Sequence, residues 1–308
     1  MRDLIAGIDL GGTNVRIAVS DQKAPEKFLV HVSEKTPVEE GPAAFLELVE
    51  KGINECLTSL DASKEELKGV GCTIPGITDA DEGMALLVTN LPGWDNYPIQ
   101  EKLATKLGVP AAVDNDVNAA ALGEYWYGQG RGTHSVVYLT ISTGIAAGIV
   151  VQGQLFRGFN HAAGEMGFFV PDASLIDQSW EPNGCLELTS AGVGIVARYN
   201  EKVDTGSTKL ASAKEVFDVA AHGEALAKEI VENATNYLAQ TVIAIATIID
   251  PEKVVLSGSI VQHQPQVFER IVSMTSKHIP HAPQVVCSEF DGNAPLIGAL
   301  ALIARQLV

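Results

Sequence analysis

Two turns that contain glycine carry side chains suited to a phosphorylated ligand. The first follows an apolar run, Leu4–Ile8, and holds Asp9, Gly11, Gly12 and Thr13. Glycine lets backbone N–H groups approach an anion closely, and Thr13 adds a hydroxyl donor. Asp9 is suited to hold a hydrated Mg²⁺ beside the same phosphates. The alternative is an ordinary β-hairpin whose glycines serve only the turn.

The second turn, Ser142-Thr143-Gly144, lies between two apolar runs at 136–141 and 145–151. Its place between two strand-like runs matches that of the first turn. Two such hairpins in one chain indicate two related lobes, each offering a turn to one polyphosphate.

A cluster of carboxylates and amides, Asp114-Asn-Asp-Val-Asn118, follows a buried strand expected at 111–113. Either Asp114 or Asn115 is suited to cap the helix expected at 119–128, whose N-terminus brings positive potential. Four polar residues in five exceed what capping needs. The segment therefore predicts a carboxylate base.

Three further polar positions are candidates for ligand contacts, and the first suits a sugar. Asn90-Leu-Pro-Gly-Trp-Asp-Asn96 combines amides with an aromatic ring, although a surface loop with Trp94 tucked beneath it explains the same residues. Glu165 lies between glycines in an apolar stretch, so it is either exposed on a turn or placed for a ligand. Glu187 opens an expected helix, where a carboxylate also satisfies N-terminal N–H groups.

Periodicity predicts the elements that position these residues. Strands are expected at 4–8, 15–19, 28–32, 70–74, 111–113, 136–141, 145–151, 253–256 and 285–287. Helices are expected at 45–60, 99–107, 119–128, 223–250, 259 to about 277, and 295–307. The turn at Ser257-Gly258-Ser259 either covers an adenosine or simply connects a strand to a helix.

Composition bounds the class of protein. The 308 residues include 46% hydrophobic residues and 29 glycines, which fits an α/β enzyme. The formal net charge of −17 argues against a nucleic-acid or anionic-membrane partner. Four scattered cysteines favour a reducing cytoplasm over disulfides. A strand expected at the very start leaves no room for a signal peptide, so none is expected.

Seven short motifs span most of the chain: D-L-G-G-T (9–13), I-P-G-I-T-D (74–79), N-L-P-G-W (90–94), D-N-D-V-N (114–118), S-T-G-I-A-A-G (142–148), A-G-E-M-G (163–167) and G-C-L-E (184–187). In this order they resemble the ROK family (repressors, open reading frames and kinases) of sugar kinases. The resemblance implies an α/β protein with the actin-like ATPase (ribonuclease H-like) fold, two-lobed, with ATP and a hexose in an interlobe cleft. We expect residues 1–116 plus 292–308 in the N-terminal lobe and 117–291 in the C-terminal lobe. A homodimer is also expected.

The resemblance also implies roles for single residues. Asp116 is the expected general base, and Asp9 holds Mg²⁺ through water. The expected sugar contacts are Gly76, Asn90, Asn115, Asp116, Glu165 and Glu187. The expected ATP contacts are Asp9, Gly11, Gly12, Thr13, Thr143, Gly144 and Gly258.

The chain departs from the family at its zinc motif. Many members bind a structural zinc through one histidine and three cysteines, at positions occupied here by Phe168, Gln178, Trp180 and Cys185. One thiolate cannot hold a tetrahedral zinc, so we expect none. We expect packing of Phe168 and Trp180 to brace this loop instead. Near the expected ATP contacts, Ala146, Ala147, Ser257 and Ser259 stand where glycine is usual.

The sequence thus predicts an ATP-dependent hexose kinase that phosphorylates a sugar 6-hydroxyl. Glucose is the first expected substrate, with mannose, fructose or N-acetylmannosamine as alternatives. A sugar-binding sensor without turnover is an alternative of another class. The altered adenosine turn leaves open a different phosphoryl donor, such as polyphosphate.

Overall fold

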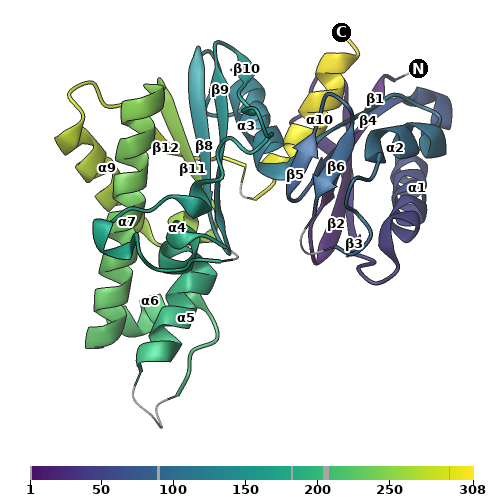
Figure 1. Ribbon diagram of the computed structural model, residues 1–308. Helices are drawn as coiled ribbons and strands as arrows, with labels where there is room; N and C mark the ends of the chain where they lie inside the picture. The colour runs from purple at the N-terminus through teal and green to yellow at the C-terminus, as the bar shows by residue number, and fades with distance from the viewer. Residues whose placement is uncertain (1, 89–90, 182, 204–207, 291) are drawn as a thin grey trace. The chain divides into compact units, whose positions relative to one another are not determined.

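The computed structural model describes residues 2–88, 91–181, 183–203, 208–290 and 292–308. The chain divides into two compact units (Figure 1). The first contains residues 1–132, 148–163 and 289–308, and the second contains residues 133–147 and 164–288. The lobe boundary expected near residue 116 stays a prediction.

The first unit is built on a five-stranded sheet of order β3-β2-β1-β4-β7. Strands β1 and β2 form the expected antiparallel hairpin, and β1, β4 and β7 run parallel. The strands are β1 (Leu4–Leu10), β2 (Asn14–Asp21), β3 (Phe28–Lys35), β4 (Leu67–Ile74), β5 (Ile77–Asp79), β6 (Met84–Leu87), β7 (Ala111–Asn115) and β10 (Gln154–Leu155). The helices are α1 (Gly41–Ser59), η1 (Lys64–Glu66), α2 (Ile99–Leu107), α3 (Asp116–Tyr127) and α10 (Ala294–Gln306).

Helices cover both faces of this sheet, which explains why β1 is buried along its whole length. Leu4, Ala6 and Ile8 face the core shared with α1 and α2. The alternate residue Ile5 packs with apolar side chains of α10 on the opposite face. Figure 1 shows α10 beside β1 and β4, away from α1 and α2. A strand buried on both faces is a continuous apolar run, as the sequence predicts.

The second unit contains β8 (Ser135–Ile141), the start of β9 (Ile145–Val151), β11 (Lys253–Ser257) and β12 (Gln284–Cys287). These strands belong to a sheet of order β10-β9-β8-β11-β12, in which β11 is parallel to β8 and β12. The helices are η2 (Met166–Phe168), η3 (Ala173–Leu175), α4 (Cys185–Ser190), α5 (Gly192–Lys202), α6 (Ala213–Ala221), α7 (Ala225–Ile249), α8 (Ser259–His263) and α9 (Pro265–His278). The long α7 packs against α4, α5, α6 and α9 (Figure 1).

The observed helices differ from the expected ones in two ways. The helix expected from residue 259 to about 277 is divided into α8 and α9, because Gln264 is not helical and Pro265 starts the second helix. The periodicity also gave no prediction of α5 and α6. Within the described ranges, no helix combines the length and apolar character needed to span a bilayer.

Candidate active site

The carboxyl ends of three parallel strands bring the predicted acids of the first unit to one edge. Asp9 on β1 is in register with Thr73 on β4, and Thr73 is in register with Asp114 on β7. In α/β sheets, ligands bind outside the carboxyl ends of strands. The sheet therefore places the Asp9 turn and the segment 114–118 at the same edge, where both can contact bound substrates.

Asp9 is held by two donors that the sequence analysis missed. Arg16 Nη2 and Nε donate to its Oδ2 at 2.6 and 2.9 Å, and Thr73 Oγ1 donates to its Oδ1 at 2.7 Å. Arg16 also donates to the carbonyl of Gly292 and to Asn293 Oδ1. Asp9 and Arg16 are opposite each other in the β1–β2 hairpin, so the turn length contained the signal for this pair. No comparable pattern in the sequence predicts the contact between Thr73 and Asp9.

This geometry bears on whether Asp9 suits Mg²⁺. Mg²⁺ retains several waters and needs one or two carboxylates beside substrate phosphates. Both Asp9 oxygens already accept hydrogen bonds, and the Arg16 charge lies against Oδ2, so direct ligation is disfavoured. A contact through water remains compatible, since each carboxylate oxygen accepts more than one donor. The described residues contain no group of three or more His, Cys, Asp or Glu side chains placed to hold a metal.

The predicted phosphate turn of the first unit is open at Gly12. The Gly11 N–H donates to the Asn14 carbonyl at 3.0 Å, and Thr36 bonds to the carbonyls of Gly11 and Thr13. A Cβ on Gly12 would meet no atom within 4 Å. The turn is thus held by the Gly11–Asn14 backbone bond and by Thr36, and it leaves room for a ligand at its tip.

Asn115, and not Asp114, caps α3. Its Oδ1 accepts from the N–H groups of Val117 and Asn118 at 2.9 and 3.1 Å. Its Nδ2 donates to the Gly76 carbonyl at 2.8 Å and to Asp116 Oδ1 at 3.0 Å. One amide thereby joins three of the predicted sugar-site residues: Gly76, Asn115 and Asp116. The half-buried Asp116 also accepts from the Val117 N–H at 2.9 Å.

Trp94 is not the exposed ring that a sugar contact in the expected segment 90–96 would use. Asn90 lies outside the described residues. Trp94 is 2% exposed and packs edge-on against Phe45 and Tyr97. Its ring is therefore part of the core of the first unit, as the alternative of a loop above a buried Trp requires.

In the second unit, the turns that follow β8 and β11 lie together. Ser142 Oγ and Ser259 Oγ are 3.1 Å apart, and β8 and β11 end in register. The backbone N–H of Gly192 donates to the Ser142 carbonyl, while Thr143 is exposed at the tip of its turn. The predicted ATP contacts Thr143, Gly144 and Gly258 therefore occupy neighbouring strand ends.

Glu187 reaches the same turn. Its Oε2 accepts from the Ile145 N–H at 3.2 Å, and a Cβ on Gly144 would lie 2.4 Å from that oxygen. Burial raises the pKa of Glu187, and the Ile145 N–H opposes the rise. Partial burial of the Glu165 carboxyl raises its pKa as well, and the nearby Glu187 adds to it, although Glu165 as a whole residue is exposed. Two neighbouring carboxyls with raised pKa values, such as Glu165 and Glu187, are typical of a functional site.

Gly258 has a structural reason to be glycine. Its φ is +94°, and a Cβ there would lie 2.3 Å from the carbonyl oxygen of Ile141. Only glycine adopts this backbone without strain.

We therefore predict that Gly258→Ala lowers the free energy of unfolding by about 1–3 kcal/mol from backbone strain alone. Urea unfolding of both proteins would measure the change. Gly12→Ala is the matched control, since an added Cβ there meets no atom. Equal midpoints for the two variants would contradict the prediction.

The loop at the family's zinc motif is not braced as expected. Phe168 is 60% exposed, so its ring does not form a packed brace. Trp180 Nε1 donates to the Leu175 carbonyl at 2.9 Å, and the Gly184 N–H donates to the Trp180 carbonyl at 2.7 Å. Gly184 approaches Gly167 so closely that a Cβ would lie 2.5 Å from its oxygen. Hydrogen bonds to backbone carbonyls, one of them from the Trp180 side chain, thus hold the loop. The absence of zinc stays a prediction.

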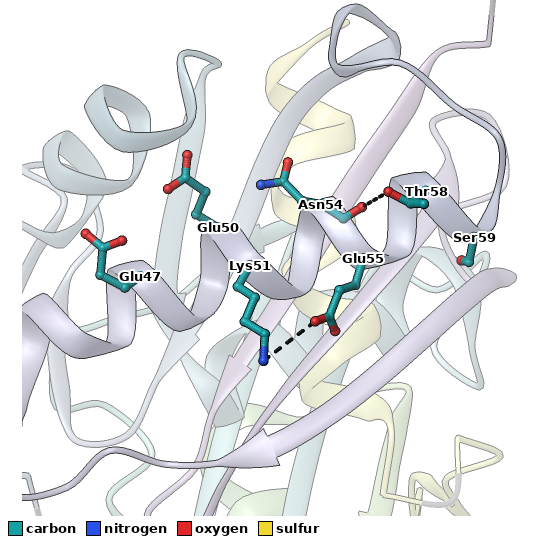
Figure 2. A pocket seen from close by; sticks show the side chains of 7 residues that line it. All are labelled: Glu47, Glu50, Lys51, Asn54, Glu55, Thr58 and Ser59. Atoms are coloured by element: carbon teal, nitrogen blue, oxygen red, sulfur yellow. Dashed lines mark hydrogen bonds and ion pairs between the residues drawn. The ribbon is translucent and has the colours of Figure 1, made fainter.

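A hollow on the surface of α1 is separate from these residues. Figure 2 shows that its seven lining side chains all come from this one helix, with Lys51 paired to Glu55. It contains none of the residues predicted for the sugar or ATP.

Comparison with known proteins places these features in a family. A model of the ROK family matches residues 5–306. A glucokinase from Thermotoga maritima is 29% identical over 317 residues, which cover 98% of this chain and 98% of that protein. An N-acetyl-D-glucosamine kinase from Vibrio cholerae is 30% identical over 309 residues, which cover 96% and 98%. A ROK family glucokinase from Streptomyces griseus, solved with glucose and AMPPNP, has a TM-score of 0.75 and 25% identity, covering 98% and 99%.

Proposed function

The chain belongs to the ROK family, and from this premise we propose that it is a hexose kinase that transfers the γ-phosphoryl group of ATP to a sugar 6-hydroxyl. The predicted resemblance and the actin-like ATPase fold are confirmed by the family match and the structural neighbours. That the chain is an ATP-dependent sugar kinase rests on relatives matched over almost their whole length. The identity of the sugar and the site residues are part of the proposal.

The observation that carries the proposal is the anchoring of Asp116 at the start of α3. Asn115 Nδ2 and the Val117 N–H both donate to Oδ1, which fixes the orientation of the carboxylate. A positioned carboxylate can take the proton from a hydroxyl as its oxygen attacks phosphorus, and such bases contribute about 10²- to 10⁴-fold in rate. Phosphoryl transfer otherwise depends on positioning and charge neutralisation.

The other residues of the site divide between sugar and nucleotide. In the proposal, Glu165, Glu187, Asn115 and Gly76 bind sugar hydroxyls, and Asn90 adds a further contact. The turns at 11–13 and 143–144, with Gly258, hold ATP. Asp9 would hold Mg²⁺ through water, and this ion would neutralise charge on the phosphates.

Glucose and N-acetyl-D-glucosamine are the first sugars to test, since the relatives above are named for them. Mannose, fructose and N-acetylmannosamine follow. A coupled ADP-release assay with Mg-ATP against this panel tests the proposal. Turnover on one sugar would identify the substrate. A folded protein that releases no ADP with any sugar would contradict it, and repeating the panel with polyphosphate would test the other donor. We also propose that the protein is cytoplasmic and that it forms a homodimer. Light scattering after gel filtration would check the homodimer.

The raised pKa values of Glu165 and Glu187 predict how sugar binding depends on pH. Ionised carboxylates accept hydrogen bonds from sugar hydroxyls and lose that capacity when protonated. Because both pKa values are raised, protonation begins at a higher pH than for an ordinary glutamate. We expect KM for the sugar to rise as the pH falls from neutrality toward the ordinary glutamate value near pH 4.3, with the rise beginning above that value.

Measuring KM for sugar across that range in the wild type and in Glu165→Gln would check this. The variant should have a higher KM at neutral pH and a weaker pH dependence, because one of the two ionisations is gone. A pH dependence identical to that of the wild type would contradict the assignment of Glu165.

A further inference from the structure

Asp114 is a charged side chain that the proposed reaction does not use. It is fully buried at the end of β7. Its Oδ2 accepts from Arg157 Nη2 at 2.5 Å. Its Oδ1 accepts from the Asn115 N–H at 2.8 Å and from Asn118 Nδ2 at 3.4 Å. A buried carboxylate is stable only when it is paired and hydrogen-bonded, so these contacts account for its position.

Arg157 belongs to the segment that follows β10, more than forty positions further along the same unit. Its carbonyl accepts from the Ala163 N–H at 2.9 Å, which closes the loop 157–163 on itself. Its side chain is 25% exposed, and its buried Nε makes no hydrogen bond with the described residues. The guanidinium is thus directed onto Asp114 and is not a solvated surface cation.

The two contacts of Asp114 Oδ1 lie on either side of Asp116. Asn115 precedes Asp116 and donates directly to its Oδ1. Asn118 follows it, in the first turn of α3. A shift of Asp114 would therefore move both ends of the short segment that orients Asp116.

We propose that Arg157 is a positioning residue for the base Asp116, acting through Asp114. The guanidinium keeps Asp114 ionised, and the ionised Asp114 holds Asn115 and Asn118 in place. The inference rests on the proposed function, because it assumes that Asp116 is the base.

The charges around Asp114 predict what happens when Arg157 is removed. Burial raises the pKa of Asp114, and the Arg157 charge is the main influence that opposes the rise. Asn115 and Asn118 contribute uncharged donors to the same carboxylate. Without Arg157, Asp114 is a buried charge without a counter-ion, and it takes up a proton or draws in water. Either change alters the hydrogen bonds that fix Asn115.

The test compares Arg157→Met, Arg157→Lys and the double variant Arg157→Met/Asp114→Asn. We expect Arg157→Met to lower kcat by about tenfold to a hundredfold, the size of a small misplacement of a catalytic group, with little change in KM for ATP. Arg157→Lys retains the charge and should lie between this variant and the wild type. The double variant should recover most of kcat, because an Asn oxygen accepts from the Asn115 N–H without a counter-ion. Arg270→Met is the matched control, since Arg270 is exposed and bonds only to Asn236 among the contacts described.

The pH profile separates positioning from a purely structural role. In Arg157→Met, the further rise in the Asp114 pKa should add an ionisation to the kcat profile that the double variant lacks. A double variant no faster than Arg157→Met, or unchanged pH profiles, would overturn the inference.

A second readout does not need turnover, so it distinguishes failure of this inference from failure of the proposed function. A group whose folded pKa is raised loses its stabilising contribution as the pH rises from its unfolded pKa through its folded pKa. The urea midpoint of Arg157→Met should therefore fall further below that of the wild type as the pH rises, and the double variant should not show this trend. If no sugar is phosphorylated but this trend appears, the Arg157–Asp114 coupling holds and the kinase assignment fails. Without the trend, the coupling itself is wrong.

Discussion

Asp116→Asn is expected to lower kcat for sugar phosphorylation by about 10²- to 10⁴-fold, the contribution of a positioned general base. Asn has almost the same shape as Asp, and its Oδ1 can keep the two hydrogen bonds from Asn115 Nδ2 and the Val117 N–H. The fold and the binding of sugar should therefore survive, while the capacity to take a proton is lost. Initial rates with Mg-ATP and calorimetric titration of sugar would measure the two effects.

Asp172→Asn is the matched control, because Asp172 also accepts from a backbone N–H at a helix start but is none of the proposed site residues. It should retain kcat. If Asp116→Asn turned over sugar at the wild-type rate, Asp116 would not be the base. If neither the wild type nor the variant turned over but both bound sugar, the protein would be a sugar-binding sensor.

Gly144→Ala is expected to raise KM for sugar by roughly tenfold to a hundredfold, because it displaces the carboxylate of Glu187. The new Cβ would lie 2.4 Å from Glu187 Oε2, which must then move away from the Ile145 N–H. A hydrogen bond to a charged group contributes about 1.5–3 kcal/mol, and each 1.4 kcal/mol is a factor of ten. The displaced atom is the end of a flexible side chain, so the fold should tolerate the change.

Gly12→Ala provides the comparison, because an added Cβ there meets no atom within 4 Å and Gly12 belongs to the other unit. Any effect of Gly12→Ala should appear in KM for ATP, while KM for sugar stays near the wild-type value. Steady-state kinetics with each substrate varied in turn would separate the two. An unchanged KM for sugar in Gly144→Ala would show that Glu187 does not bind the sugar.

Several features of the fold and of the site are determined by residues that are close together in the sequence. The β1–β2 hairpin, the amphipathic α1 and the long α7 arise from patterns within a few residues: an apolar run, a glycine turn, or a 3.6-residue period. The cap of α3 is also local, since Asn115 bonds to N–H groups two and three residues away. Even the pairing of Asp9 with Arg16 follows from the length of the hairpin turn, although we did not predict this pair from the sequence.

The sequence by itself therefore determined most of the elements, the family and the short motifs from which the site is drawn. Tertiary structure alone decided what stands beside each motif: Thr73 at Asp9, Arg157 at Asp114, and Glu187 at Gly144. It also decided that Trp94 is a core residue and that Phe168 is exposed. The physical reason is that parallel strand pairing and loop packing join residues tens of positions apart. Their partners depend on register and on which faces are covered, and neither leaves a periodic signal in the chain.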